Sequence, residues 1–196
     1  MLSFVIIYEL KGENVMKARI LSVTFIVGFL ALGVLAPKPS MAQEKENEYA
    51  SLLKVLSNSK HSLADGIRQA SKSTEVPISA KFELDDNGKL SLSVYTAENG
   101  LTTDAEHNVL KELSGSPEAA AWNPEAEVFK DPEHLKRAAE QQTLMAVSKM
   151  SLLDVIAKAQ KQQPGTVFSV TPVVVGHQPK FNVLVANNGR VITLAL

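Results

Sequence analysis

The spacing of apolar residues changes twice along this chain, from the period of a helix to the period of a strand. In the second half, the segment SLLDVIAKA beginning at Ser151 has apolar residues at i, i+3, i+4 and i+7, the stripe that an amphipathic helix buries. Further on, Thr166 to Val175 is apolar almost throughout, and Phe181, Val183 and Val185 recur at every second position. A period of two predicts strands, so this half is expected to form a helix followed by strands.

The first half carries a related pattern in the segment SLADGIRQA, which begins at Ser62. Behind it, the apolar residues from Ile78 to Leu84 alternate with Ser79, Lys81 and Glu83, which predicts a strand with one face in solvent. Gly66 lies on the apolar stripe of the predicted helix, where it costs about 1 kcal/mol relative to Ala. Two explanations stay open: a strand approaches the helix closely at Gly66, or the helix is simply weaker.

Both segments begin with the same polar signal, Ser followed by Asp three residues later: Ser62 with Asp65, and Ser151 with Asp154. A Ser hydroxyl accepts a hydrogen bond from the third backbone N–H, and the acid side chain bonds back to the Ser N–H. We therefore predict that both helices start at these capping boxes.

Turn residues divide the segments behind each helix into short strands. The turns DDNG at 85–88 and ENG at 98–100 bound a returning strand from Leu90 to Tyr95, and a short third strand is expected at 101–103. In the second half, GHQP at 176–179 and NNG at 187–189 separate the strands in the same way, and the last strand is expected at 191–196. Each half thus predicts one helix followed by a three-stranded antiparallel meander.

Each half is preceded by a further helical pattern. Tyr49, Leu52, Leu53 and Leu56 form one stripe; Leu135, Ala138, Ala139 and the residues 144–147 form the other, with Asp131 as cap and Pro132 at the first helical position.

We therefore expect an α+β protein with a first unit at 43–104, a connector at 105–130 holding a short helix and then a loop, and a second unit at 131–196. The two units could stack sheet against sheet or join their edge strands. We favour two subdomains that share one interface, because about 60 residues are marginal for independent stability.

The two units resemble the PepSY domain family. The segments that carry the resemblance are SLLDVIAKAQK with FSVTPVVVGHQPKFNVLVANNGRV in the second unit, and SLADGIRQASKS with ISAKFELDDNGKLSLSVY in the first. The resemblance implies a cystatin-like arrangement of helix and sheet, and an exported, non-catalytic module of a kind proposed to restrain peptidases. No peptidase domain follows Leu196 in this sequence, so we expect any such action to occur in trans.

The first 42 residues resemble a secretory signal peptide. Lys17 and Arg19 precede an apolar run from Ile20 to Leu35, and small residues at Ser40 and Ala42 suit cleavage after Ala42. The protein would then be periplasmic or secreted. The apolar run is shorter than the about 20 residues of a spanning helix, so cleavage is favoured over retention as a membrane anchor. Translation starting at Met16 rather than Met1 is a second possibility, suggested by the segment KGENVM.

The amino-acid composition limits which partners the protein can bind and what can stabilise its fold. The chain has 20 Lys and Arg residues and 21 Asp and Glu residues. Removal of residues 1–42, which hold four cations and two anions, leaves a net charge of about −3, and this charge is too small to indicate binding to nucleic acid or to an anionic membrane. The chain has no Cys, so no disulfide stabilises the exported domain.

The sequence contains no clear motif for catalysis or for metal binding. His61, His107, His134 and His177 lack the i, i+3 or i+4 spacing of a zinc site, and the DDNG segment lacks the distant bidentate acid of a calcium loop. No nucleophile or phosphate-loop motif is present. We expect no catalysis, no cofactor and no metal.

The candidate partner-binding residues are Trp122, Tyr95 and His177. Trp122 has a second interpretation, as an anchor that packs the connector onto a unit, although Trp is also enriched at binding hot spots.

Two functions are compatible with these features. The first is a non-catalytic PepSY-like binding module whose partner is an envelope protein, with a peptidase as one candidate. The second is a periplasmic small-ligand or lipid-binding protein, which a cavity of a few hundred cubic ångströms between helix and sheet would favour.

Overall fold

The computed structural model describes residues 41–196. The predicted leader, with both candidate start residues, lies outside these described residues except for its last two positions. The expected α+β class is confirmed, with four α-helices and one antiparallel sheet in the described part of the chain.

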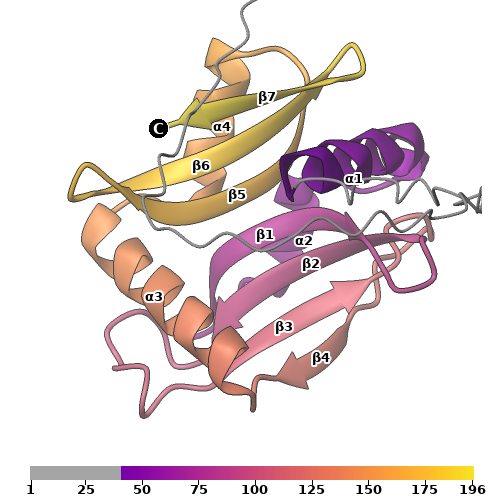
Figure 1. Ribbon diagram of the computed structural model, residues 1–196. Coiled ribbons are helices and arrows are strands. Elements are labelled where there is room, and N and C mark those ends of the chain that lie inside the picture. Colours follow the sequence, from indigo (N-terminus) through magenta and orange to yellow (C-terminus); the bar gives the residue numbers. More distant parts are fainter. Residues whose placement is uncertain (1–40) are drawn as a thin grey trace, which may run out of the picture. The chain divides into compact units, whose positions relative to one another are not determined.

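The sheet has seven strands in the order β4-β3-β2-β1-β5-β6-β7, and all neighbours are antiparallel (Figure 1). In chain order, β1, β2 and β3 follow the helix α2, and β5, β6 and β7 follow the helix α4. The strands are β1 (Val76–Leu84), β2 (Leu90–Ala97), β3 (Leu110–Gly115), β4 (Glu125–Val128), β5 (Thr166–Val175), β6 (Gln178–Asn187) and β7 (Arg190–Ala195).

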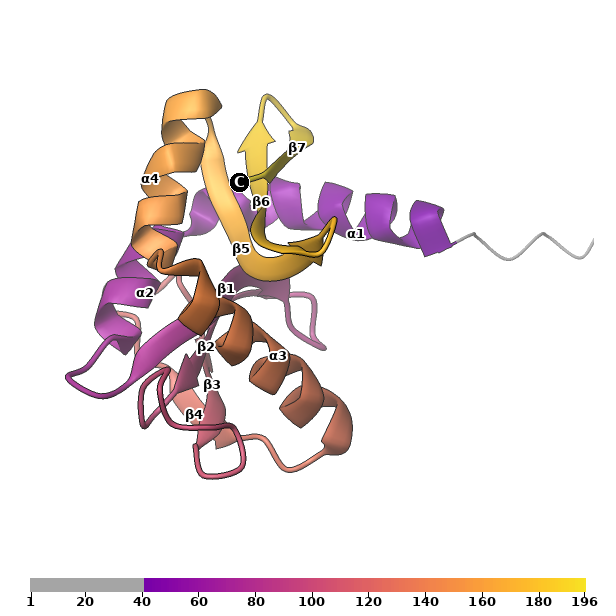
Figure 2. The same ribbon diagram turned by 90° about the vertical axis from the view of Figure 1, so that its left-hand side faces the viewer.

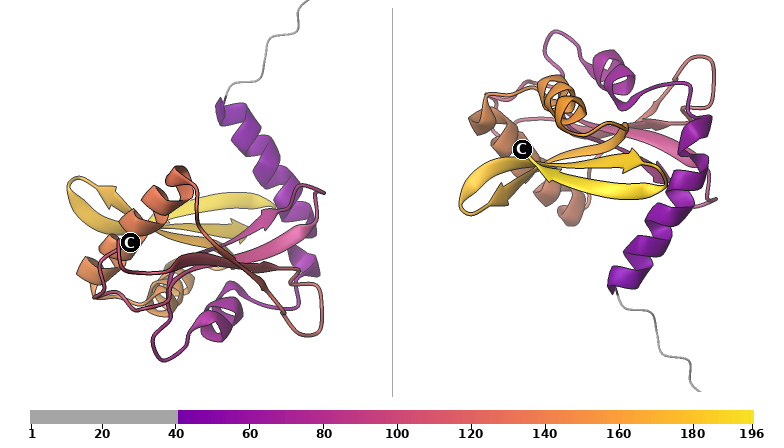
Figure 3. Two further views of the ribbon diagram at one scale, coloured as in Figure 1. Left: turned by 90° about the horizontal axis from the view of Figure 1, so that it is seen from below. Right: turned by 90° about the horizontal axis from the view of Figure 1, so that it is seen from above.

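Helices cover both faces of this sheet. Figure 2 and Figure 3 show α2 and α4 on one face and α3 on the other, while the first turns of α1 extend away from the sheet. The contacts agree, since α2 packs on β1 and β2, α4 packs on β5, and α3 crosses β5, β1 and β6. The helices are α1 (Met41–Val55), α2 (Leu63–Ala70), α3 (Pro132–Ser148) and α4 (Leu152–Gln162), and a short 3-10 helix, η1 (Leu56–Asn58), continues α1.

The two meanders join edge to edge. Ala80 of β1 lies opposite Val170 of β5, and Lys81 lies opposite Ser169. The Ser79 hydroxyl adds a hydrogen bond of 3.3 Å to the Val170 carbonyl. Of the two arrangements left open by the sequence, the structure therefore has joined edges, and a single hydrophobic core runs beneath α2 and α4.

Both predicted capping boxes are confirmed. The Ser62 hydroxyl accepts from the Asp65 N–H at 3.2 Å, and the Asp65 carboxylate accepts from the Ser62 N–H at 2.9 Å. Ser151 and Asp154 repeat this geometry at 3.1 and 3.3 Å. The cap of α3 is also confirmed, because the Asp131 carboxylate accepts from the His134 N–H at 3.0 Å and Pro132 is the first helical residue.

Gly66 allows α2 to lie close to the sheet. A Cβ atom at this position would come within 2.7 Å of Leu92 Cδ2 on β2, and the Leu92 side chain is fully buried. Of the two explanations for Gly66, the structure supports close approach of a strand.

The connector was predicted wrongly. No third strand forms at 101–103, and no helix forms between 105 and 130; instead β3 and β4 lie there and extend the sheet beyond β2. Leu110 and Leu113 are buried on β3, but two buried residues three apart show no strand alternation. Residues 110–115 form a strand because the backbone groups at the edge of β2 need hydrogen-bond partners, which this strand supplies.

The predicted solvent face of β1 is covered. Ser79 is only 2% exposed, because α3 lies across this face of the sheet. The apolar stripe expected on α3 is correspondingly wrong at two positions: Leu135 and Val147 are exposed, whereas Gln141 and Gln142 are buried. A helix that packs on a polar face buries polar residues with it.

The Gly66–Leu92 contact makes a testable prediction. Gly66→Ala should lower the free energy of unfolding by about 1 kcal/mol, because overpacking of about 1–3 kcal/mol outweighs the about 1 kcal/mol gained in helix propensity. In a Leu92→Val background, which removes the clashing Cδ2 atom, the same substitution should stabilise. Urea unfolding of the four proteins of this double-mutant cycle measures the sign change.

Ala64→Gly on the same helix is the control for propensity alone and should cost about 1 kcal/mol in both backgrounds. An equal effect of Gly66→Ala in the two backgrounds would contradict the close approach.

Candidate binding cavities

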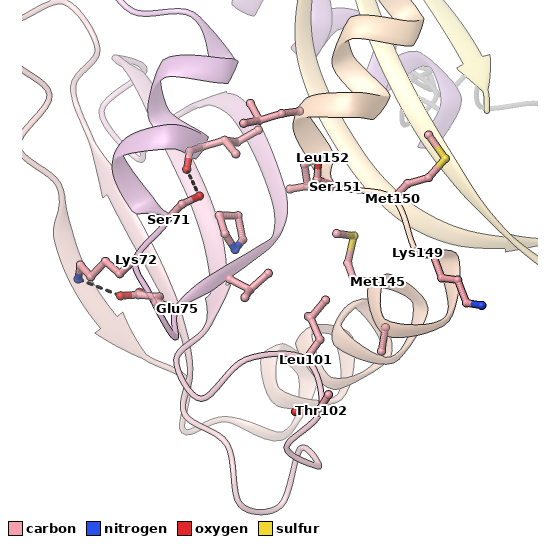
Figure 4. Close-up of a pocket in the computed structure, with 15 residues that line it drawn as sticks. Ser71, Lys72, Glu75, Leu101, Thr102, Met145, Lys149, Met150, Ser151 and Leu152 are labelled. Carbon is pink, nitrogen blue, oxygen red and sulfur yellow. Dashed lines mark hydrogen bonds and ion pairs between the residues drawn. The ribbon is translucent and has the colours of Figure 1, made fainter.

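The first cavity, here named the helix-end cavity, has a volume of about 520 Å³ and lies where α2 ends, β1 starts and α3 passes into α4 (Figure 4). Its wall is mainly apolar. In Figure 4, Leu101 and Met145 extend into the same space, and Lys149 is directed away from it. The apolar lining residues are Ile67, Val76, Pro77, Leu101, Met145, Ala146, Met150, Leu152 and Leu153.

Local backbone geometry opens this space. Lys149 adopts a left-handed conformation with φ of 56° and ends α3, so the chain turns before Ser151 caps α4. On the opposite side, α2 ends at Ser71, whose hydroxyl donates to the Ile67 carbonyl at 2.7 Å. The end of α2 and the junction of α3 with α4 therefore face each other across the cavity, and no side chain from either is large enough to fill it.

A buried ion-pair cluster borders the cavity. Glu75 is 3% exposed, and its carboxylate accepts from Lys72 Nζ at 2.8 Å, from the Thr96 hydroxyl at 2.8 Å and from Lys111 Nζ at 3.2 Å. Lys111 also contacts Glu98 at 2.8 Å. These groups come from the α2–β1 turn and from β2 and β3, so they attach the start of β1 to its neighbours.

The cluster keeps its charges. Burial by itself would raise the pKa of Glu75, but the hydrogen bonds from Lys72, Thr96 and Lys111 outweigh burial and hold this pKa below 4.5. Burial likewise opposes the charged form of Lys111, and Glu98 and Glu75 overcome it, so the pKa of Lys111 is raised. A carboxylate that is ionised and fully paired is suited to holding structure rather than to transferring protons.

The second cavity, here named the sheet–α3 cleft, has a volume of about 450 Å³ and lies on the opposite face of the sheet. Ser79, Lys81, Tyr95 and Thr171 come from the sheet, and His134, Arg137 and Gln141 from α3. Tyr49 of α1 and Phe129 complete the wall.

Aromatic rings are packed along this cleft. The ring centroids of Tyr95 and Phe129 are 5.7 Å apart, and His134 stacks on Phe129 at 5.4 Å with an interplanar angle of 17°. Lys81 Nζ lies 5.6 Å from the Tyr95 centroid. Burial raises the pKa of the Tyr95 hydroxyl to about 12 against the opposing effect of Lys81, so the hydroxyl stays protonated and able to donate.

The structure does not bring the three candidate partner-binding residues together. Trp122 is 1% exposed and its indole N–H donates to the Gly115 carbonyl at 3.3 Å. Tyr95 lines the sheet–α3 cleft. His177 is exposed in the β5–β6 turn with φ of 64°.

Residues that sequence reasoning missed are Glu75, Met145 and Met150 at the first cavity, and Arg137 and Gln141 at the second. One signal was available for α3: Ala138, Gln141, Gln142 and Met145 follow the spacing i, i+3, i+4 and i+7 of a buried stripe. Two glutamines on such a stripe indicate a helix that packs on a polar surface.

In residues 47–196, no group of three or more His, Asp or Glu side chains is arranged to hold a metal ion. The same residues include no helix with the length and hydropathy that a bilayer-spanning helix requires. Comparisons of the chain with protein-family models, with curated proteins and with solved structures find no match.

The Glu75 cluster makes a prediction with a defined pH dependence. Glu75→Gln should lower the free energy of unfolding by about 2 kcal/mol at pH 7, because Lys111 loses its buried anionic partner and keeps only the exposed Glu98. A carboxylate whose folded pKa lies below 4.5 stabilises above that pH, and the stabilisation is lost as the pH falls through the folded value. The wild-type advantage should therefore shrink below about pH 4.

Urea unfolding of both proteins between pH 3 and pH 8 measures this difference. Glu98→Gln is the control: Glu98 is 46% exposed, and its loss should cost less than about 1 kcal/mol. A difference between wild type and Glu75→Gln that is constant across the pH range would rule out the ionised cluster.

Proposed function

We propose that this chain is an exported, non-catalytic binding protein, and that the helix-end cavity holds an apolar ligand such as an acyl chain. The observation that carries the proposal is a cavity of about 520 Å³ with nine apolar lining residues between the ends of three helices. Small-ligand sites have volumes of about 300–1,000 Å³ and predominantly apolar walls.

The composition of the wall supports an elongated, variable ligand. Met145 lies in the last turn of α3 and Met150 in the α3–α4 turn. Methionine side chains adapt to irregular shapes because they are unbranched and polarizable. Of the charged lining residues, Lys72 and Glu75 pair with each other at 2.8 Å, and the exposed Lys149 is directed away from the space (Figure 4). The cavity therefore offers burial of apolar surface and no unmatched buried charge.

A second candidate is modulation of a peptidase in trans, as the resemblance to PepSY domains suggests. The order of elements favours it: α2 and α4 start at the same type of capping box, and each precedes three antiparallel strands. We propose that the two halves descend from one PepSY-like unit. In this case the helix-end cavity would receive an apolar side chain of the peptidase, in the periplasm or outside the cell.

The binding proposal is tested with two matched variants on adjacent residues of α3. Ala146 lines the helix-end cavity, whereas Val147 is 55% exposed and does not. The wild-type protein should bind the uncharged fluorophore N-phenyl-1-naphthylamine with a rise in its fluorescence, and 1-dodecanol should displace it. Ala146→Glu should weaken binding more than about 10-fold, because a charge placed at an apolar wall must be desolvated when the ligand enters.

Val147→Glu should bind the fluorophore as the wild-type protein does. Equal affinity of the two variants, or no binding by the wild type, would overturn the assignment of this cavity.

The peptidase candidate predicts that the purified protein slows peptide hydrolysis by a thermolysin-type metallopeptidase, that Ala146→Glu relieves the inhibition and that Val147→Glu does not. Initial rates with a chromogenic peptide measure the effect. Unchanged rates at micromolar concentrations of the protein would count against peptidase modulation and leave ligand binding in place.

A further inference from the structure

We propose that the sheet–α3 cleft is a second ligand site, and that it binds a small aromatic carboxylate. This inference goes beyond the proposed function, because the cleft lies on the opposite face of the sheet from the helix-end cavity and has a different chemistry. Apolar groups dominate the helix-end cavity, whereas polar and aromatic groups line the cleft.

The charge of the wall favours an anion. Lys81, Arg137 and His134 line the cleft, and no carboxylate is among its lining residues. Lys81 is paired with Glu83, and His134 Nδ1 lies 2.7 Å from an Asp131 carboxylate oxygen. Arg137 is exposed and forms no ion pair with any carboxylate of residues 47–196, whose side chains the structure describes. One positive charge is thus left for a ligand, and a planar guanidinium matches a carboxylate with two parallel hydrogen bonds.

An amide in the wall provides a second polar contact. Gln141 lines the cleft, and its amide is not sealed from solvent. A ligand can therefore take the place of water at this amide. Gln141 follows Arg137 by four residues, so both side chains lie on one face of α3. A ligand with a carboxylate at Arg137 places its neighbouring polar atoms within reach of this amide.

Aromatic walls favour a flat ring as the body of the ligand. Tyr95 and Phe129, whose ring centroids are 5.7 Å apart, line the cleft together with Tyr49. Rings of this kind stack on or meet the edge of a ligand ring at centroid distances of about 4.5–7 Å. The protonated Tyr95 hydroxyl does not repel an anion. A volume of about 450 Å³ admits one or two fused rings rather than a folded peptide.

Titration of the full-length protein with benzoate, followed by NMR, tests the proposal. Benzoate should shift backbone signals of residues in β2 and in the first half of α3, and the neutral isostere benzamide should bind at least about 10-fold more weakly. Arg137→Gln should reduce benzoate affinity at least about 10-fold. Arg137→Lys should retain part of the affinity, since Lys keeps the positive charge but lacks the two parallel N–H donors of the guanidinium group. Lys136→Gln, an exposed cation one residue away that does not line the cleft, should bind benzoate as the wild type does.

Equal affinity for benzoate and benzamide, no shift up to 20 mM benzoate, or equal effects of Arg137→Gln and Lys136→Gln would each overturn the proposal. Ala146→Glu distinguishes the two cavities. Benzoate binding that survives in this variant supports a site separate from the helix-end cavity, and benzoate binding that is lost in it assigns the ligand to that cavity instead. Thermal unfolding of each variant verifies that it is folded.

Discussion

The pairing of β1 with β5 is the interaction on which both candidate sites depend. It is a short seam, formed where Ala80 and Lys81 meet Val170 and Ser169. By joining two meanders into one sheet, it brings the end of α2 opposite the start of α4, and the space left between them is the helix-end cavity. On the other face, α3 crosses the same seam, and the sheet–α3 cleft has walls from both sides of it. Neither half of the chain forms either cavity alone.

The two cavities differ because the two faces of β1 differ. The face under α2 and α4 carries Ile78, Ala80 and Phe82, all at most 3% exposed, so the space beside it is apolar and the one buried acid, Glu75, is fully paired. The other face carries Ser79, Lys81 and Glu83, and α3 can cover it only with side chains that tolerate polar neighbours. Gln141 and the solvent-exposed Arg137 meet that condition. Strict alternation in one strand thus leads to an apolar site and a polar site on opposite faces.

Local signals in the sequence were sufficient for most of the elements. The Ser-x-x-Asp boxes marked the first turns of α2 and α4, and the alternation at 78–84 and the apolar run at 166–175 located β1 and β5. These features depend on interactions within a few residues, which spacing records directly. The strands β3 and β4 were missed because an edge of the sheet, not their own pattern, decides their conformation. The cavities were missed for a related reason, since their lining residues are separated by up to 122 positions in the chain, from Tyr49 to Thr171 in the sheet–α3 cleft.

The sequence by itself determined where α2, α3 and α4 begin, where β1, β2, β5 and β6 lie, which face of α2 and α4 is apolar, and that no Cys contributes to stability. Only the tertiary structure decided that the two meanders join at their edges and that α3 packs on the face of β1 whose polar residues predicted exposure to solvent. It also decided that Glu75, Arg137 and Gln141 border cavities. The physical reason is the range of the forces involved. Capping and periodicity act between neighbours along the chain, whereas burial, ion pairing and cavity formation depend on which distant surfaces meet, and an apolar or polar pattern allows more than one partner for each surface.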